Sequence, residues 1–461
     1  MKRNKKLLPL ILLIISAFFL SYTFYESEIK YKGTEHSYYF KYYLICFLFV
    51  LCSVISFFLK RETIRNISII FISTLFILYL INTYVFFKIG RTVNSITGRF
   101  QFYEDQKTLD NNIVIAMYRE SAVYDHSSPF ELSDRSNKKT IMCNENGYFS
   151  IFHTDRYGFN NPDSEWEKKE IDFLLIGDSF VHGACVNESD TISGNLRKMT
   201  DNGGVLNLGY SGNGSLKEYA TLREYLPLKK TNRVVWFYFE HNDLIDLIDE
   251  LENKILSNYL HDRTFTQKLH IRQNEIDKKL EKIFDESYQQ KRKELRNIHR
   301  SKILSFIRLY DLRRFIKQTL MSTLSHEPLI TVSSNQALRT FSEIIYLSKI
   351  LSEDNGAKFY FVFLPRGYRY SRHKTEPYEK LELKEYKNVI NIVNKLNIPI
   401  IDINKDLFKK HSDPLSLFPN RLLHYHYNEL GYQLVAKTIL KKIIEYEKNL
   451  PKNTKLQLLV P

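Results

Sequence analysis

The sequence lacks the short motifs that mark most metal and nucleotide sites. Only four cysteines occur among its 461 residues, and no two form a Cys-x-x-Cys pair, so zinc-ribbon and thioredoxin-type sites have no support. No Gly-x-x-x-x-Gly-Lys and no His-Glu-x-x-His run is present, which argues against a phosphate-binding loop and a zincin centre. The protein is therefore expected to use no cofactor and no metal ion.

The few cysteines fall into two groups. Cys46 and Cys52 lie in an apolar run, where cysteine usually serves as a small hydrophobic side chain. Cys143 and Cys185 lie in the polar part of the chain, and two alternatives stay open for them. They pair as a disulfide if this part of the chain lies in an oxidising compartment, and otherwise they are two free thiols.

Acidic residues are outnumbered, since 66 Lys and Arg stand against 52 Asp and Glu, giving a formal net charge of +14. A basic balance is typical of proteins that bind nucleic acid or an anionic membrane surface. No zinc-finger, homeodomain or RNA-binding signature is present, and the positive charge is spread along the chain. We therefore expect the lipid bilayer, and no nucleic acid, as a partner.

Three long apolar runs without a charge open the chain, at residues 7–24, 42–59 and 67–87. Each has about the 20 residues that a helix needs to cross a bilayer. A signal peptide is the alternative for the first run, but no small-x-small cleavage site follows it. Residues 1–91 are therefore predicted to be a membrane segment with three transmembrane helices.

The flanking positive charges predict how this segment is oriented. Lys5 and Lys6 precede the first run, and Lys60, Arg61 and Arg65 crowd the loop after the second. Basic loops stay on the cytoplasmic side, so an odd number of spans places everything after the third run outside. The predicted location is the inner (cytoplasmic) membrane, multi-pass, with the remainder of the chain extracytoplasmic.

The polar remainder shows the pattern of an α/β protein. Residues 92–165 have no clear periodicity and are predicted to be an ordered lead-in segment. Short, continuously apolar runs rich in Val, Ile, Leu and Phe then alternate with helical stretches, as in a doubly wound parallel sheet. The runs lie at residues 171–179, 204–209, 233–240, 358–365 and 398–403. A highly charged stretch at 251–325, with apolar positions at helical spacing, is predicted to be a helical insertion.

Residues suited to acyl chemistry stand where these predicted strands end, which is where open α/β sheets bind ligands. Ser179 follows the first strand in Gly-Asp-Ser, Gly212 follows the second, and Asn242 follows the third. His426 stands near the C-terminus in His-x-Asn-x-x-Gly, before the last predicted helix. A serine beside a histidine base is an activated nucleophile, and a backbone N–H and a side-chain amide are donors for an oxyanion.

The order of these four pieces resembles that of the SGNH/GDSL hydrolase superfamily over roughly residues 155–447. The resemblance implies a flavodoxin-like SGNH hydrolase domain over residues 166–450. It also implies that Ser179 is the nucleophile, His426 is its base, and Gly212 and Asn242 with the Ser179 N–H bind the oxyanion. An SGNH domain tied to membrane helices resembles the membrane-anchored bacterial type found among polysaccharide O-acetylation and deacetylation proteins.

The sequence departs from the family pattern at the residue that orients the catalytic histidine. The family usually has Asp two or three residues before that histidine, but here positions 424 and 423 are His and Leu. Three interpretations remain open: a backbone carbonyl orients His426, Asp413 or another carboxylate reaches in from elsewhere, or the site is degraded.

The resemblance implies an esterase or O-acyltransferase acting on acyl esters, above all acetyl esters, of envelope carbohydrate. A membrane acyltransferase or glycosyltransferase is then an expected partner. The alternative is a catalytically inactive membrane component of a polysaccharide assembly complex.

The predicted orientation is tested by fusing reporters after residue 100. An alkaline phosphatase fused there should be active, because that enzyme folds only outside the cytoplasm, and a cytoplasmic reporter at the same point should be silent. The opposite pattern would mean that one of the three spans does not cross the membrane.

Overall fold

The computed structural model describes residues 7–33, 36–88, 96–117, 125–200, 203–299, 306–307, 309, 312–313, 316, 334–371, 374–421 and 426–449. The chain divides into two compact units. One comprises Met1–Val85 with Phe306–Arg313, and the other comprises Phe86–Ser305 with Arg314–Pro461. The first holds the apolar helices, and the second holds the α/β sheet.

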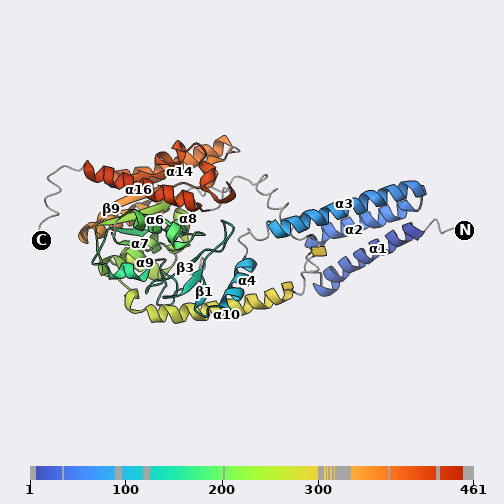
Figure 1. Cartoon of the computed structure of the whole chain (residues 1–461), viewed down its shortest axis with the longest axis horizontal. Coiled ribbons are helices and arrows are strands. Elements are labelled where there is room, and N and C mark those ends of the chain that lie inside the picture. The colour runs from blue at the N-terminus through green and yellow to red at the C-terminus, as the bar shows by residue number, and fades with distance from the viewer. Residues whose placement is uncertain are drawn as a thin grey trace. The chain divides into compact units, whose positions relative to one another are not determined.

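The apolar unit contains α1 (Leu7–Phe24), which continues as a short π-helix (Tyr25–Lys30), then α2 (His36–Ser56) and α3 (Arg61–Lys88) (Figure 1). Three stretches are long and apolar enough to cross a membrane: Pro9–Lys30, Tyr39–Ser56 and Glu62–Val85. They fall on the three predicted spans, although α2 ends three residues before the predicted limit of 59. Polar side chains inside these helices pair with one another, as the Oγ atoms of Ser16 and Ser53 do at 3.0 Å.

A five-stranded parallel sheet forms the centre of the second unit. Its strands lie in the order β10-β9-β8-β5-β6, every neighbouring pair is parallel, and each falls within one of the predicted runs. In chain order the arrangement is 2-1-3-4-5, the flavodoxin-like order. The predicted doubly wound α/β fold is confirmed. The strands are β5 (Phe173–Ile176), β6 (Val205–Asn207), β8 (Arg233–Phe239), β9 (Lys358–Leu364) and β10 (Ile400–Asp402).

Both faces of the sheet are covered, which is why its strands read as unbroken apolar runs. Alternate residues along a strand point to opposite faces, so Leu174 and Ile176 of β5 join one core while Phe173 and Leu175 join the other. The first face is covered by α7 (Ser215–Tyr225), α13 (Asn335–Asp354) and α14 (Glu376–Lys395). The second is covered by α6 (Ile192–Met199) and α16 (Glu429–Lys448).

The predicted lead-in segment contains regular structure of its own. Helix α4 (Ile96–Lys107) precedes a small sheet in which β2 (Lys139–Ile141) pairs in parallel with β1 (Ile113–Ile115) and antiparallel with β3 (Ile151–His153). Strands of three residues are too short to show an alternating pattern, which is why sequence periodicity gave no sign of them.

The predicted insertion begins with helices, as its amphipathic pattern indicated: α9 (Lys254–His261) and α10 (Gln273–His299). Apolar residues of this part, including Leu256 and Ile276, are buried in the core of the α7 face. Farther along α10, Phe284 and Tyr288 pack with Phe100 of α4. The stretch is therefore built into the fold. Its residues 300–305, 308, 310–311, 314–315 and 317–325 lie outside the described residues.

Shorter elements complete the unit. They are the parallel pair β4 (Glu170–Ile171) and β7 (Lys230–Thr231), helices α5 (Ser179–His182), α8 (Asp243–Glu250) and α15 (Ile403–Asp406), and 3₁₀ turns at Asp163–Glu167, Glu188–Asp190, Leu226–Leu228, Leu269–Ile271, Gly367–Tyr370, Phe408–Lys410, Pro414–Leu417 and Pro419–Arg421.

Candidate active site

Ser179 is the first residue of α5, directly after the carboxyl end of β5. Asp178 caps this short helix, since its carboxylate accepts the Phe180 N–H at 2.9 Å. Gly177 makes the turn sterically feasible, because a Cβ there would lie 2.4 Å from the Val181 side chain. The Gly-Asp-Ser sequence therefore places the serine at the ligand-binding edge of the sheet.

His426 enters from the other end of the chain, just before α16, and its motif has a physical basis. Asn428 caps α16 by accepting the Gly431 N–H at 2.9 Å. Gly431 lies so close to Leu417 that an added Cβ would be 2.6 Å from the Leu417 carbonyl oxygen. These contacts hold the start of α16 in place, and the histidine with it.

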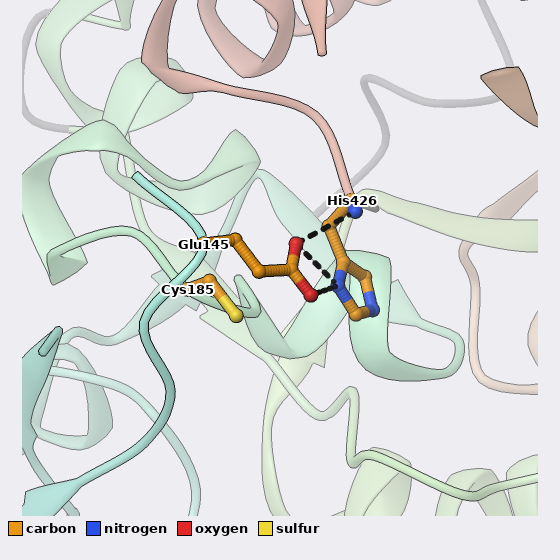
Figure 2. Close-up of side chains that lie close together, drawn as sticks. All are labelled: Glu145, Cys185 and His426. Atoms are coloured by element: carbon orange, nitrogen blue, oxygen red, sulfur yellow. Dashed lines mark hydrogen bonds and ion pairs between the residues drawn. The ribbon is translucent and has the colours of Figure 1, made fainter. Parts of the chain in front are cut away.

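The structure brings Ser179 and His426 together: the Nε2 atom of His426 lies 2.9 Å from the Ser179 Oγ. The other ring nitrogen, Nδ1, lies 3.1 and 3.2 Å from the two carboxylate oxygens of Glu145. That carboxylate also accepts the His426 backbone N–H at 2.8 Å (Figure 2). Serine, imidazole and carboxylate thus form one hydrogen-bonded chain, the arrangement of a catalytic triad.

Glu145 settles which group orients His426. The carboxylate does come from elsewhere in the chain, but Asp413 was the wrong candidate, because its carboxylate pairs with Arg421. His424 and Leu423 lie outside the described residues. The Glu145 carboxylate holds Nδ1, so a backbone carbonyl is not needed for this role.

The loop that carries Glu145, between β2 and β3, is attached to residues on both sides of the site by a disulfide and two side-chain hydrogen bonds. Cys143 and Cys185 form a disulfide, so the first of the two alternatives for these cysteines is the one observed. The Asn146 side chain donates to the Cys185 carbonyl at 3.1 Å. The Tyr148 hydroxyl donates to Glu429, in the first turn of α16, at 2.6 Å. Because Cys185 closely follows α5, this loop is tied to the helices on both sides of the site.

The charge of Glu145 sets the protonation behaviour of His426. Burial by itself would lower the pKa of this imidazole, but the charge and hydrogen bond of Glu145, aided by Asp178, outweigh it and raise the pKa. Only 7% of the Glu145 side chain is exposed, so its charge is weakly screened. The ring is therefore set up to take a proton from Ser179 and to be stabilised as the imidazolium.

Gly212 lies in the loop after β6 and has a φ of +81°, in the left-handed region. The space beside it is open, because an added Cβ would meet nothing within 4 Å. The Lys217 ammonium donates a hydrogen bond to the Gly212 carbonyl oxygen at 2.9 Å. The residue therefore lies on an open, fixed loop at the same edge of the sheet as Ser179.

Asn242 follows β8 and precedes α8, at that same edge. Its Nδ2 donates one hydrogen to Asp246 at 2.7 Å, which fixes the orientation of the amide and leaves its second N–H for another acceptor. No contact among the described residues joins Gly212 or Asn242 to Ser179, so their oxyanion role stays a prediction.

His182 is a buried histidine to which sequence reasoning assigned no role. Its Nδ1 accepts the Ser211 backbone N–H at 3.3 Å and lies 3.0 Å from the Ser211 hydroxyl. Burial lowers the pKa of His182 to about 3, so the ring is neutral and can act as an acceptor. It links α5 to the loop of Gly212 and thereby positions that loop beside Ser179.

A metal site at this place does not fit the donor chemistry. Glu145, Cys185 and His426 have atoms within 4.8 Å of one another, a spacing that suits a metal ion (Figure 2). The Cys185 sulfur is bonded to Cys143, however, and only a thiolate is a good ligand. The Glu145 carboxylate and the His426 Nδ1 are already hydrogen-bonded to each other.

Known structures of G-D-S-L lipolytic proteins and acetyl xylan esterases are similar to this chain. A putative G-D-S-L family lipolytic protein from Desulfitobacterium hafniense is 13% identical, with a TM-score of 0.32 over 60% of this chain and 99% of that one. The acetyl xylan esterase AlAXEase is 10% identical, with a TM-score of 0.32 over 59% and 98%. The acetylxylan esterase Axe2 from Geobacillus stearothermophilus is 13% identical, with a TM-score of 0.31 over 59% and 94%.

No family model and no curated protein matches the chain. At these identities and TM-scores, the similarity to solved structures carries no weight by itself. The assignment of fold and site rests on the strand order and on the hydrogen-bonded chain from Ser179 to Glu145.

Replacing Glu145 by Gln should lower kcat/KM for an aryl acetate on the order of 1000-fold or more, because the imidazolium loses its counter-charge. His426 must be neutral to act as a base, so activity rises with pH through its pKa. Glu145 raises that pKa, so the variant's residual activity should rise at lower pH than in the wild type.

Asp413→Asn is the matched control, because that carboxylate pairs only with exposed Arg421 among the described residues. It should keep wild-type rates. Wild-type rates and an unchanged pH profile in Glu145→Gln would contradict its assigned position in the site.

Reducing the disulfide should also lower activity. Freed from Cys185, the Glu145 loop loses one of its three attachments, and displacement of an orienting group by about 1 Å costs up to about 100-fold in rate. Activity should fall after reduction and alkylation, and also in the Cys143→Ser, Cys185→Ser variant. The Cys46→Ser, Cys52→Ser variant lacks only the free cysteines and should match the wild type before reduction. Full activity in the reduced protein would show that the other attachments suffice.

Proposed function

We propose that this protein is a membrane-anchored serine esterase or O-acyltransferase that acts on acyl esters, acetyl esters above all, of envelope carbohydrate. The observation that carries the proposal is the continuous hydrogen-bonded chain of Ser179, His426 and Glu145. Such a chain activates a hydroxyl for attack on an ester carbonyl.

In the first half of the reaction, Ser179 Oγ bonds to the carbonyl carbon while its proton passes to His426 Nε2. The Glu145 carboxylate stabilises the imidazolium that forms. The carbonyl oxygen becomes an oxyanion, for which the Gly212 N–H and the Asn242 amide are the proposed donors. The tetrahedral intermediate then expels the alcohol, which takes the proton from His426 and leaves an acyl-enzyme.

In the second half, His426 removes a proton from an incoming hydroxyl group, whose oxygen attacks the acyl carbon. The bond from that carbon to Ser179 Oγ then breaks, and Oγ takes the proton from His426, which restores both side chains. Water as the attacking group makes the protein an esterase, and a sugar hydroxyl makes it an O-acyltransferase. The same residues serve both reactions, so the two differ only in what occupies the acceptor position.

Two observations support an extracytoplasmic site and an envelope substrate. Three helices are long and apolar enough to anchor the chain in a membrane. The Cys143–Cys185 disulfide is a feature of proteins in oxidising compartments. A glycan exported across the membrane would meet the site there, which makes a membrane acyltransferase or glycosyltransferase a natural partner.

The alternative is a catalytically inactive component of a polysaccharide assembly complex, which would keep the fold as a carbohydrate-binding surface. Such a protein has no need of a buried carboxylate held by three attachments against the Nδ1 of His426. The intact chain of contacts therefore favours the enzyme.

The proposal is tested with a fluorophosphonate probe, which bonds covalently to an activated serine. The purified full-length protein should be labelled, and Ser179→Ala should abolish both labelling and hydrolysis of an aryl acetate. Ser189→Ala, which alters an exposed serine in the 3₁₀ turn Glu188–Asp190, should label like the wild type. A well-folded wild type that neither labels nor hydrolyses the ester would favour the inactive alternative.

A further inference from the structure

The third membrane helix, α3, has several polar side chains near its C-terminal end, and two of them contact a distant part of the chain. Tyr79 and Asn82 both lie inside the apolar stretch Glu62–Val85. Asn82 is completely buried within the apolar unit. An amide in the hydrocarbon region is costly unless it is hydrogen bonded within the protein, so what covers Asn82 matters.

The covering residues come from far along the chain. The Leu312 backbone N–H donates to the Asn82 Oδ1 at 3.0 Å, and the Tyr79 hydroxyl donates to the Ile307 carbonyl at 2.8 Å. The rings of Tyr79 and Phe306 lie with their centroids 5.4 Å apart. Phe306–Arg313 accordingly belongs to the same compact unit as the three helices.

Non-helical backbone at membrane depth requires that its polar groups find partners within the protein, and several described groups of the segment have them. Within the described residues, α3 side chains satisfy the Ile307 carbonyl and the Leu312 N–H. Turns within the segment satisfy further backbone groups. The Leu309 N–H donates to the Phe306 carbonyl oxygen at 3.0 Å, and the Arg313 N–H donates to the Leu309 carbonyl oxygen at 2.9 Å.

The depth of the contact follows from the helix geometry. Val85 ends the apolar stretch, and Tyr79 lies six residues before it and Asn82 three residues before it. At 1.5 Å per residue, Tyr79 is about 9 Å and Asn82 about 4.5 Å inside the end of the span. One leaflet contributes roughly 15 Å of hydrocarbon. The segment therefore meets α3 within the hydrocarbon of one leaflet.

Of the described apolar side chains in the segment, one is buried in the apolar unit and two are exposed on its surface. Leu312 is 5% exposed, whereas Phe306 and Ile307 are 44% and 54% exposed. Large apolar residues of α3 itself are similarly open, with Phe76 at 64% and Leu80 at 54%. Exposed apolar surface that continues from a membrane span, at the same depth, suits lipid acyl chains.

We propose that the described residues Phe306, Ile307, Leu309, Leu312 and Arg313 belong to a re-entrant membrane segment. It is bound to α3 by Tyr79 and Asn82, and it presents Phe306 and Ile307 to the phospholipid acyl chains. The occupant of this surface is bilayer lipid. Arg313 is exposed, and its guanidinium suits the phosphates at the membrane surface. The proposal does not rest on the proposed catalytic function.

A depth-resolved quenching experiment on the full chain tests the proposal. Ile307→Cys is made in a Cys46→Ser, Cys52→Ser background, in which the remaining native cysteines are disulfide-bonded. The new thiol is labelled with bimane, and the protein is reconstituted in phosphatidylcholine vesicles. Ile271→Cys is the matched control, since Ile271 is 69% exposed and lies in the unit with the sheet.

Nitroxide-labelled acyl chains should quench the probe at 307 several-fold more strongly than the probe at 271, and aqueous iodide should show the reverse order. Iodide quenching at 307 equal to that at 271 would overturn the proposal, because a segment in water or against a water-exposed partner protein would behave in that way.

A second variant tests the polar attachment. Asn82→Leu removes the acceptor of the Leu312 N–H and should raise iodide quenching of the probe at 307. Thr74→Val is the control, because Thr74 lies on the same helix and bonds only to its own helix, at Ile70, among the described residues. Unchanged quenching in Asn82→Leu would contradict the attachment, as would an equal rise in Thr74→Val.

Discussion

The hydrogen bond between Glu145 and His426 is the contact on which the candidate site depends. It joins residues 281 positions apart and fixes one ring nitrogen, which leaves the other to face Ser179. Imidazole is a useful base only when its tautomer and orientation are set by its second nitrogen. Without the carboxylate, burial would disfavour the imidazolium that attack by Ser179 must create.

The carboxylate comes from outside the α/β sheet, and this explains the elaborate lead-in segment. The β2–β3 loop must hold Glu145 against a histidine carried by the last helix, so it is attached to both sides of the site. The disulfide and Asn146 bind it to Cys185, near the helix of Ser179, while Tyr148 binds it to α16. Folding of the lead-in segment and assembly of the site are thereby coupled.

The requirement that buried polar groups be hydrogen-bonded applies to the apolar unit as well, where the surrounding solvent is the lipid bilayer. Polar groups removed from water must find partners, whether they belong to a site or to a membrane span. The Glu145 carboxylate accepts hydrogen bonds from His426, and the Asn82 Oδ1 accepts one from the backbone N–H of Leu312, 230 positions away. In both cases a buried polar side chain is hydrogen-bonded to a residue from a distant part of the chain.

Local pattern in the sequence determined a large share of this protein. The five strands and the three apolar helices follow from hydrophobic pattern and run length, which are properties of neighbouring residues. Ser179 and His426 were predictable because strand ends and helix caps have short-range signals, such as Asn428 capping α16. Tertiary structure alone decided the identity of the orienting carboxylate, the pairing of Cys143 with Cys185 and the contact between Leu312 and Asn82. Each of these joins residues with no shared local pattern, because only the folded chain determines which distant side chains meet.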